Sequence, residues 1–156
     1  MEYREIEGDL IALAKAGEFD VIAHGCNCMC TMKRGLAPLM AEAFLCNTYG
    51  LEGSQYKGDI NKLGRIDYRE SDNGLIVVNC YTQYMWATPD NSQPLDYSAL
   101  ELCLKKINHV FKGKHIGLPK IGCGLAGGNW FIVQGMIKML LKDCKVTIVM
   151  DKNQTK

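Results

Sequence analysis

Two glycine-rich segments, each placed between a short apolar run and an amphipathic pattern, constrain this chain most. The first follows Phe19–His24, whose length and β-branched residues are typical of a buried strand, and precedes apolar residues at helical spacing over 35–46. The second follows the apolar run His115–Leu118 and precedes a helix that Asn129 can cap. Two units of strand, glycine loop and helix predict an α/β domain.

The other elements alternate in the same way. Asp9 is a plausible N-cap of a helix that ends at Gly17, and Asn73-Gly74 predicts a hairpin. The remaining expected elements are strands at 3–7, 63–68, 75–84 and 145–150 and a helix at 95–111, whereas the polar segment 49–62 is expected to be irregular. We therefore predict a single domain over 1–156, a three-layer α/β/α fold with a mixed, mostly parallel central sheet.

Composition limits the partners. The 156 residues suit one globular domain, and a net charge of +1 gives no electrostatic reason to expect a nucleic-acid partner. The charged N-terminal segment lacks the apolar region of a signal peptide, and no run approaches the roughly 20 apolar residues that span a bilayer. We expect a cytoplasmic monomer that does not contact membranes.

Eight cysteines are many for a chain of this size, and without a signal peptide we expect them to stay reduced. Four lie in apolar or amphipathic stretches and are predicted to pack as small hydrophobic residues: Cys46, Cys80, Cys103 and Cys144. The other four lie in the segments expected to be loops: Cys26, Cys28, Cys30 and Cys123.

The two glycine loops are where a ligand is expected. In open α/β sheets ligands bind beyond the carboxyl ends of the strands, where loops expose backbone N–H groups and helix N-termini. Glycine permits close backbone approach, so amides of both loops could surround a diphosphate. Neither loop matches the P-loop or the dinucleotide-binding motif, and each alone is also compatible with ordinary turn chemistry.

The order of short motifs along almost the whole chain resembles the macrodomain family. The motifs are Gly8-Asp9-Leu10, His24-Gly25-Cys26-Asn27, Gly35-Leu36-Ala37 and Pro119-Lys120-Ile121-Gly122-Cys123-Gly124-Leu125. The resemblance looks closest to the branch of terminal ADP-ribose glycohydrolase-type proteins, ADP-ribose 1″-phosphate phosphatases, and small phage and bacterial macrodomains. It implies ADP-ribose or a derivative as ligand, and no cofactor or metal.

The resemblance also implies roles for particular residues. Asp9 would accept a hydrogen bond from the adenine amino group, although a helix cap alone is the alternative. Asn27 would lie beside the distal ribose, and an ordinary loop asparagine is the alternative. His24 would be catalytic together with Asn27, or else a structural histidine. The other expected ligand contacts are Leu10, Arg34, Gly35, Leu36, Ala37, Gly122, Cys123, Gly124, Leu125 and Ala126.

The sequence departs from the family pattern in several places. Lys33-Arg34 precede Gly35, where relatives have further glycines, and these charges could contact a diphosphate or an extra terminal phosphate. Glycohydrolase-type relatives have an aspartate where this chain has Ala126, and the strand expected at 63–68 offers no well-placed lysine nucleophile. The tail after Met150 supplies no aromatic residue to stack on adenine.

The resulting hypothesis is a hydrolase of ADP-ribose 1″-phosphate or a related ADP-ribosyl compound, with a non-catalytic ADP-ribose reader or sequestering module as the alternative. A zinc or redox site at His24, Cys26, Cys28 and Cys30 is less compatible with the spacing, because alternate residues of one extended segment do not easily close a tetrahedron. A nucleophilic cysteine near His24 is a further alternative.

Overall fold

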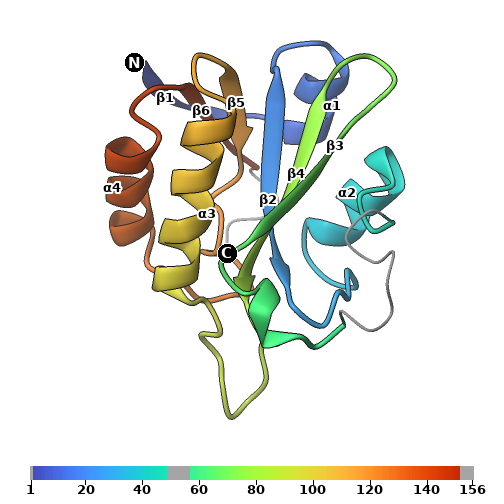
Figure 1. The fold of residues 1–156 in the computed structure, drawn as a ribbon, viewed down its shortest axis with the longest axis vertical. Coiled ribbons are helices and arrows are strands. Elements are labelled where there is room, and N and C mark those ends of the chain that lie inside the picture. The colour runs from blue at the N-terminus through green and yellow to red at the C-terminus, as the bar shows by residue number, and fades with distance from the viewer. Residues whose placement is uncertain (1, 49–56, 152–156) are drawn as a thin grey trace.

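The computed structural model describes residues 2–48 and 57–151, and its centre is a six-stranded sheet (Figure 1). The strands are β1 (Tyr3–Glu7), β2 (Val21–Asn27), β3 (Ile66–Glu70), β4 (Ile76–Gln83), β5 (His115–Leu118) and β6 (Lys145–Met150), in the order β1-β6-β5-β2-β4-β3. All neighbouring pairs are parallel except β3 with β4. The predicted fold class is confirmed.

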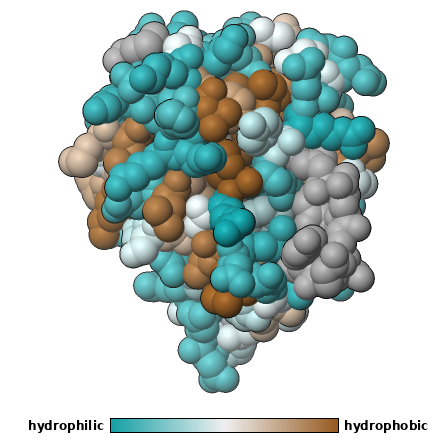
Figure 2. Space-filling view, viewed as in Figure 1, coloured by the Kyte–Doolittle hydropathy of each residue, from teal (hydrophilic) through white to brown (hydrophobic). Residues whose placement is uncertain are grey.

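Helices cover both faces of the sheet. They are α1 (Leu10–Lys15), α2 (Ala37–Phe44), α3 (Tyr97–Val110) and α4 (Trp130–Leu140), with a short 3₁₀ helix, η2 (Ile60–Lys62). Met40 of α2 packs with Leu10 of α1 against one face, whereas Leu104 of α3 and Ile137 of α4 belong to the core on the other. Figure 2 views the side that carries α3, where hydrophilic residues separate several groups of hydrophobic ones. No helix in the described ranges is long and apolar enough to cross a bilayer.

The connections after β2 and β5 create a crevice. These two strands are neighbours, with Val21 opposite Ile116, but the loop after β2 leads to α2 on one face and the loop after β5 leads to α4 on the other. In parallel α/β sheets a binding crevice forms where adjacent strands send their loops in opposite directions. The fold therefore predicts a ligand site above the ends of β2 and β5.

Strand β2 is longer than the sequence suggests. It was expected to end at His24, but it continues through Gly25 and Cys26 to Asn27, pairing with β4 despite a register shift before Asn27. Cys26, Cys28 and Cys30 are buried, as are the four cysteines predicted to pack inside, and all eight are free thiols. The end of the strand was predicted wrongly because Gly25 and Cys26 are typical of a loop. In the structure Cys26 instead lies on the same face of the sheet as Ile22 and His24.

The predicted hairpin is present, with shifted boundaries. Gly74 donates to Ser71 at 3.0 Å and has a φ of +85°, which explains the glycine in this turn. Strand β3 begins at Ile66 rather than Leu63, because the backbone at 60–62 forms η2, capped by Asp59. Of the polar segment expected to be irregular, 49–56 lies outside the described residues.

Candidate ligand-binding cleft

A cleft of about 1760 Å³ lies beyond the carboxyl ends of the parallel strands. Its lining includes residues at or just past the ends of β1, β6, β5, β2 and β4, such as Asp9, Met150, Pro119, Asn27 and Gln83. Five strands spaced roughly 4.8 Å apart extend over roughly 19 Å. The cleft therefore suits an elongated ligand better than a compact one.

The structure brings every residue of the predicted site to this cleft. They are Asp9, Leu10, His24, Asn27, Arg34, Gly35, Leu36, Ala37, Gly122, Cys123, Gly124, Leu125 and Ala126. Their individual roles stay predictions, since lining a cleft is not the same as contacting a ligand.

The two glycine loops meet across the middle of the cleft. A Cβ built on Gly35, which has a φ of +68°, would lie 3.3 Å from Cδ1 of Leu125, so these loops are in direct contact. In the described part of the chain, the N–H groups of Gly35 and Leu36 on one side and of Gly124 and Leu125 on the other donate to no acceptor. Several unused donors thus belong to two touching loops of the cleft, an arrangement suited to a diphosphate.

The N-terminus of α2 is the part of this arrangement most suited to an anion. Its N-cap position is Leu36, which provides no side-chain hydrogen bond, and Pro38 occupies the first turn. The helix therefore leaves its first amides unsatisfied by its own residues, and the partial positive charge of the helix dipole points at the cleft.

Asp9 caps α1 and lines the cleft at the same time. Its Oδ1 accepts from the N–H of Ile11 at 2.9 Å and of Ala12 at 3.1 Å. Its second carboxylate oxygen takes part in neither bond, and the side chain is exposed. The cap and a ligand contact are therefore compatible, one for each oxygen.

Asn27 is held by its own loop. Its Nδ2 donates to the carbonyl of Thr31 at 3.0 Å, and its Oδ1 accepts from the N–H of Thr31 at 3.2 Å. A further contact, from Nδ2 to the Thr31 hydroxyl at 3.1 Å, is the one a sugar hydroxyl could replace with the least disturbance. The structure thus supports the loop role of Asn27 directly and leaves room for a ligand role.

His24 lies beneath the floor of the cleft and is only 2% exposed. Its Nε2 is 2.7 Å from Oδ1 of Asn79, and the sulfur atoms of Cys26 and Cys46 each lie 3.6 Å from the same nitrogen. Burial lowers the pKa of His24 to about 4, because a charged imidazole would lose its hydration. The ring is therefore neutral at pH 7 and is not a ready proton donor.

The thiol alternative finds little support. Burial raises the pKa of Cys26 well above its usual range and those of Cys28 and Cys123 to about 11, so all three stay protonated at neutral pH. A nucleophilic cysteine needs the opposite shift. Among the described residues, no group of three or more His, Cys, Asp or Glu side chains is placed to hold a metal ion.

Several cleft residues were missed by the sequence reasoning. Trp86, in the loop after β4, and Trp130, the first residue of α4, both line the cleft, and the ammonium of Lys120 lies 5.6 Å from the centre of the Trp130 ring. They are candidates for the aromatic wall that the sequence left unassigned. Their positions in the sequence, each following a strand, could have indicated a place near the cleft. The sequence alone did not show which side chains of these segments face the cleft.

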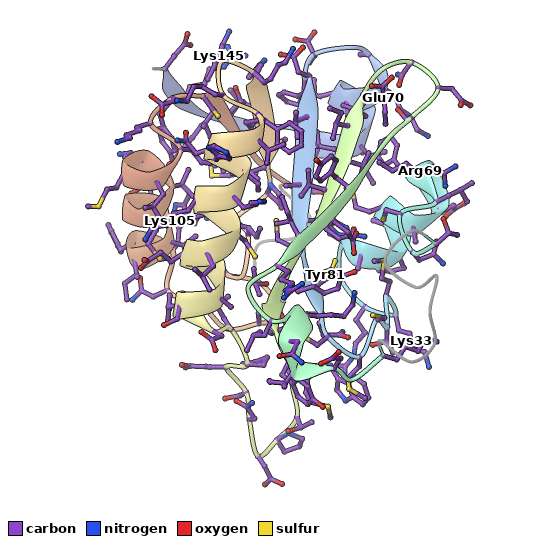
Figure 3. The ribbon with its side chains drawn as sticks, viewed as in Figure 1. Lys33, Arg69, Glu70, Tyr81, Lys105 and Lys145 are labelled. Carbon is purple, nitrogen blue, oxygen red and sulfur yellow. The ribbon has the colours of Figure 1, made fainter. Side chains whose placement is uncertain are left out.

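Lys33 also lines the cleft beside Arg34, and both are exposed. Figure 3 shows Lys33 at the end of the molecule that carries the β2–α2 loop, far from Lys145 at the opposite end. Two cations therefore stand next to the uncapped start of α2, where they favour an anionic ligand.

Comparison with known proteins adds two kinds of similarity. No family model matches the chain. The "uncharacterized 17.5 kDa protein in tk-vs intergenic region" of Enterobacteria phage T4 is 32% identical over 156 residues, and the match covers 96% of each chain. This degree of similarity over nearly the full length establishes a common family.

Solved structures identify the fold. The macrodomain of Thermus aquaticus DarG superposes with a TM-score of 0.73 at 20% identity, covering 94% of this chain and 97% of that one. Thermosipho africanus DarTG in complex with ADP-ribose has a TM-score of 0.77 at 18% identity, covering all of this chain and 43% of that one. At these identities the similarity concerns the fold.

Proposed function

Because the chain has the macrodomain fold and belongs to one family with the 17.5 kDa protein of phage T4, we propose that it binds ADP-ribose in the cleft. One observation carries the proposal. The N–H groups of Gly35, Leu36, Gly124 and Leu125 are unused in the described residues, and they belong to two loops that touch each other and line a long cleft, with the uncapped end of α2 beside them. A diphosphate in the middle would leave the adenosine on one side and the distal ribose on the other.

The ends of the cleft fit such a ligand. The carboxylate of Asp9 accepts hydrogen bonds only, which suits the exocyclic amino group of adenine at the end near β1. Asn27 and Trp86 lie toward β2 and β4, where the second ribose would extend. Aromatic rings pack well against sugar and base faces.

Calorimetry tests the proposal. ADP-ribose should bind with a 1:1 stoichiometry and more tightly than ADP, and ADP more tightly than AMP, because each truncation removes groups that the cleft would contact. Equal affinity for all three, or no heat with ADP-ribose at millimolar concentration, would refute ADP-ribose as the ligand.

Hydrolysis of ADP-ribose 1″-phosphate is a second candidate, and one observation favours it. Lys33 and Arg34 add two cations at the cleft, beyond what the backbone amides provide for a diphosphate, and Arg is suited to bidentate phosphate contacts. The candidate catalytic residues are His24 and Asn27. The purified protein should then release inorganic phosphate from this compound, and His24→Ala should abolish the release. Binding without release leaves the reader function.

A further inference from the structure

The orientation of the Asn79 side chain is fixed by its neighbours. Its Nδ2 lies 2.8 Å from the carbonyl oxygen of Cys46 and 2.8 Å from Oδ1 of Asp67. A backbone carbonyl can only accept a hydrogen bond, so the amide group must turn its NH₂ toward Cys46. Oδ1 of Asn79 must therefore face His24.

This orientation determines the tautomer of His24. Because Oδ1 of Asn79 can only accept, the His24 Nε2 at 2.7 Å from it must carry the ring hydrogen. The thiols of Cys26 and Cys46 lie on the same side, at Nε2. In the neutral ring, Nδ1 is then an unprotonated acceptor.

The Nδ1 atom is buried, and within the described ranges it has no hydrogen-bond partner. An unsatisfied buried polar atom costs about 1–3 kcal/mol, so its retention calls for an explanation. A second feature points the same way. Asp67, which holds Asn79, itself accepts from the hydroxyl of Tyr81 at 2.5 Å, so a polar chain leads from β3 and β4 to His24 at the cleft floor. Figure 3 shows Tyr81 beside the lower part of the sheet.

We propose that Asn79, held by Asp67, is a positioning residue that locks His24 as the Nε2–H tautomer. The lock accounts for the unsatisfied Nδ1, because a neutral imidazole has one N–H and Asn79 holds it at Nε2. The tautomer does not depend on the proposed function.

The tautomer is measured by NMR of the protein labelled with ¹⁵N in its histidine rings, without ligand. His24→Gln assigns the His24 signals against those of His109 and His115. We expect a protonated Nε2 and an unprotonated Nδ1. A protonated Nδ1 overturns the proposal.

Variants test the role of Asn79. Asn79→Leu should yield a mixture of both His24 tautomers. Asp67→Asn alone, which keeps an acceptor for the Asn79 amide, should retain the single Nε2–H form. Thr82→Val is the matched control, because Thr82 lies on the same strand and its buried hydroxyl has no partner within the described ranges. A single Nε2–H tautomer in folded Asn79→Leu shows that Asn79 does not position His24. If Asn79→Leu does not fold, the smaller Asn79→Ala, which also removes the acceptor for Nε2–H, gives the same decision: a single Nε2–H tautomer in it contradicts the lock.

Discussion

The N-termini of α1 and α2 both border the cleft, but a side chain caps the first and none caps the second. The start of α1 is closed by Asp9, whose carboxylate accepts from two amides of the first turn. The start of α2 has Leu36 at the cap position and no side-chain bond. Among the other helices that the structure describes, η2, α3 and α4 are capped by Asp59, Asp96 and Asn129. An uncapped start is thus peculiar to α2 within the described ranges.

The difference gives the cleft two chemically distinct ends. At α1 the amides are satisfied internally, and what faces the cleft is a carboxylate that takes a hydrogen-bond donor. At α2 the amides and the positive end of the helix dipole face the cleft, and they take an anion. A ligand with a donor-bearing base at one end and a diphosphate in its middle matches this polarity.

The largest effect on ligand affinity is expected from placing a negative charge at the N-cap position of α2. Leu36→Asp should lower ADP-ribose affinity at least about 100-fold, because a carboxylate ~5 Å from a phosphate costs about 3 kcal/mol at an effective dielectric constant near 20. Calorimetry measures it. Leu45→Asp, the same change at the other end of α2, serves as the control and should bind normally. Comparable losses in both variants would show that the α2 terminus does not hold the anion.

A smaller effect is expected where the two loops touch. Gly35→Ala should weaken ADP-ribose binding roughly 30-fold, because its Cβ would press on Leu125 and the left-handed backbone would shift the adjacent amides. Gly74→Ala is the matched control, since its φ of +85° imposes similar strain but open space surrounds it. Both variants should lose about 1 kcal/mol of unfolding free energy in urea titrations. Only Gly35→Ala should lose affinity; a normal affinity would exclude this loop from the diphosphate site.

A substitution at Asp9 can distinguish its role as the helix cap of α1 from a role in ligand binding. Asp9→Ser keeps an oxygen for the amides of Ile11 and Ala12 but removes the carboxylate, so stability should change by only a few tenths of a kcal/mol while ADP-ribose affinity falls about 10-fold. Asp96→Ala at α3 should do the reverse, losing about 1 kcal/mol of stability and no affinity. Unchanged binding by Asp9→Ser would assign Asp9 to capping alone.

The smallest effect is expected from the exposed cations beside α2. Arg34→Ala should reduce ADP-ribose affinity about 3-fold and ADP-ribose 1″-phosphate affinity about 10-fold at low salt, with both differences shrinking as salt screens the charge. Arg69→Ala on β3 is a control outside the cleft. An equal effect of Arg34→Ala on the two ligands would remove the reason for placing a terminal phosphate there.

The sequence predicted local structure well where one strong signal decided it. Asp9, Asn129 and the Asn73-Gly74 turn act through neighbours a few residues away, so their consequences were readable. Strand β6 also occurs at the predicted residues. The continuation of β2 through Cys26 was not readable, because it depends on pairing with β4, more than fifty residues away.

The candidate site likewise has features that the sequence alone indicated and features that only the tertiary structure shows. The chain by itself determined which loops would carry the glycines and therefore where amides could approach a ligand. Only the tertiary structure decided that both loops share one cleft, that Trp86 and Trp130 line it, and that His24 is buried against Asn79. The physical reason is that backbone preference is local, whereas burial, tautomer and the direction of a side chain are set by atoms that the fold brings from elsewhere in the chain.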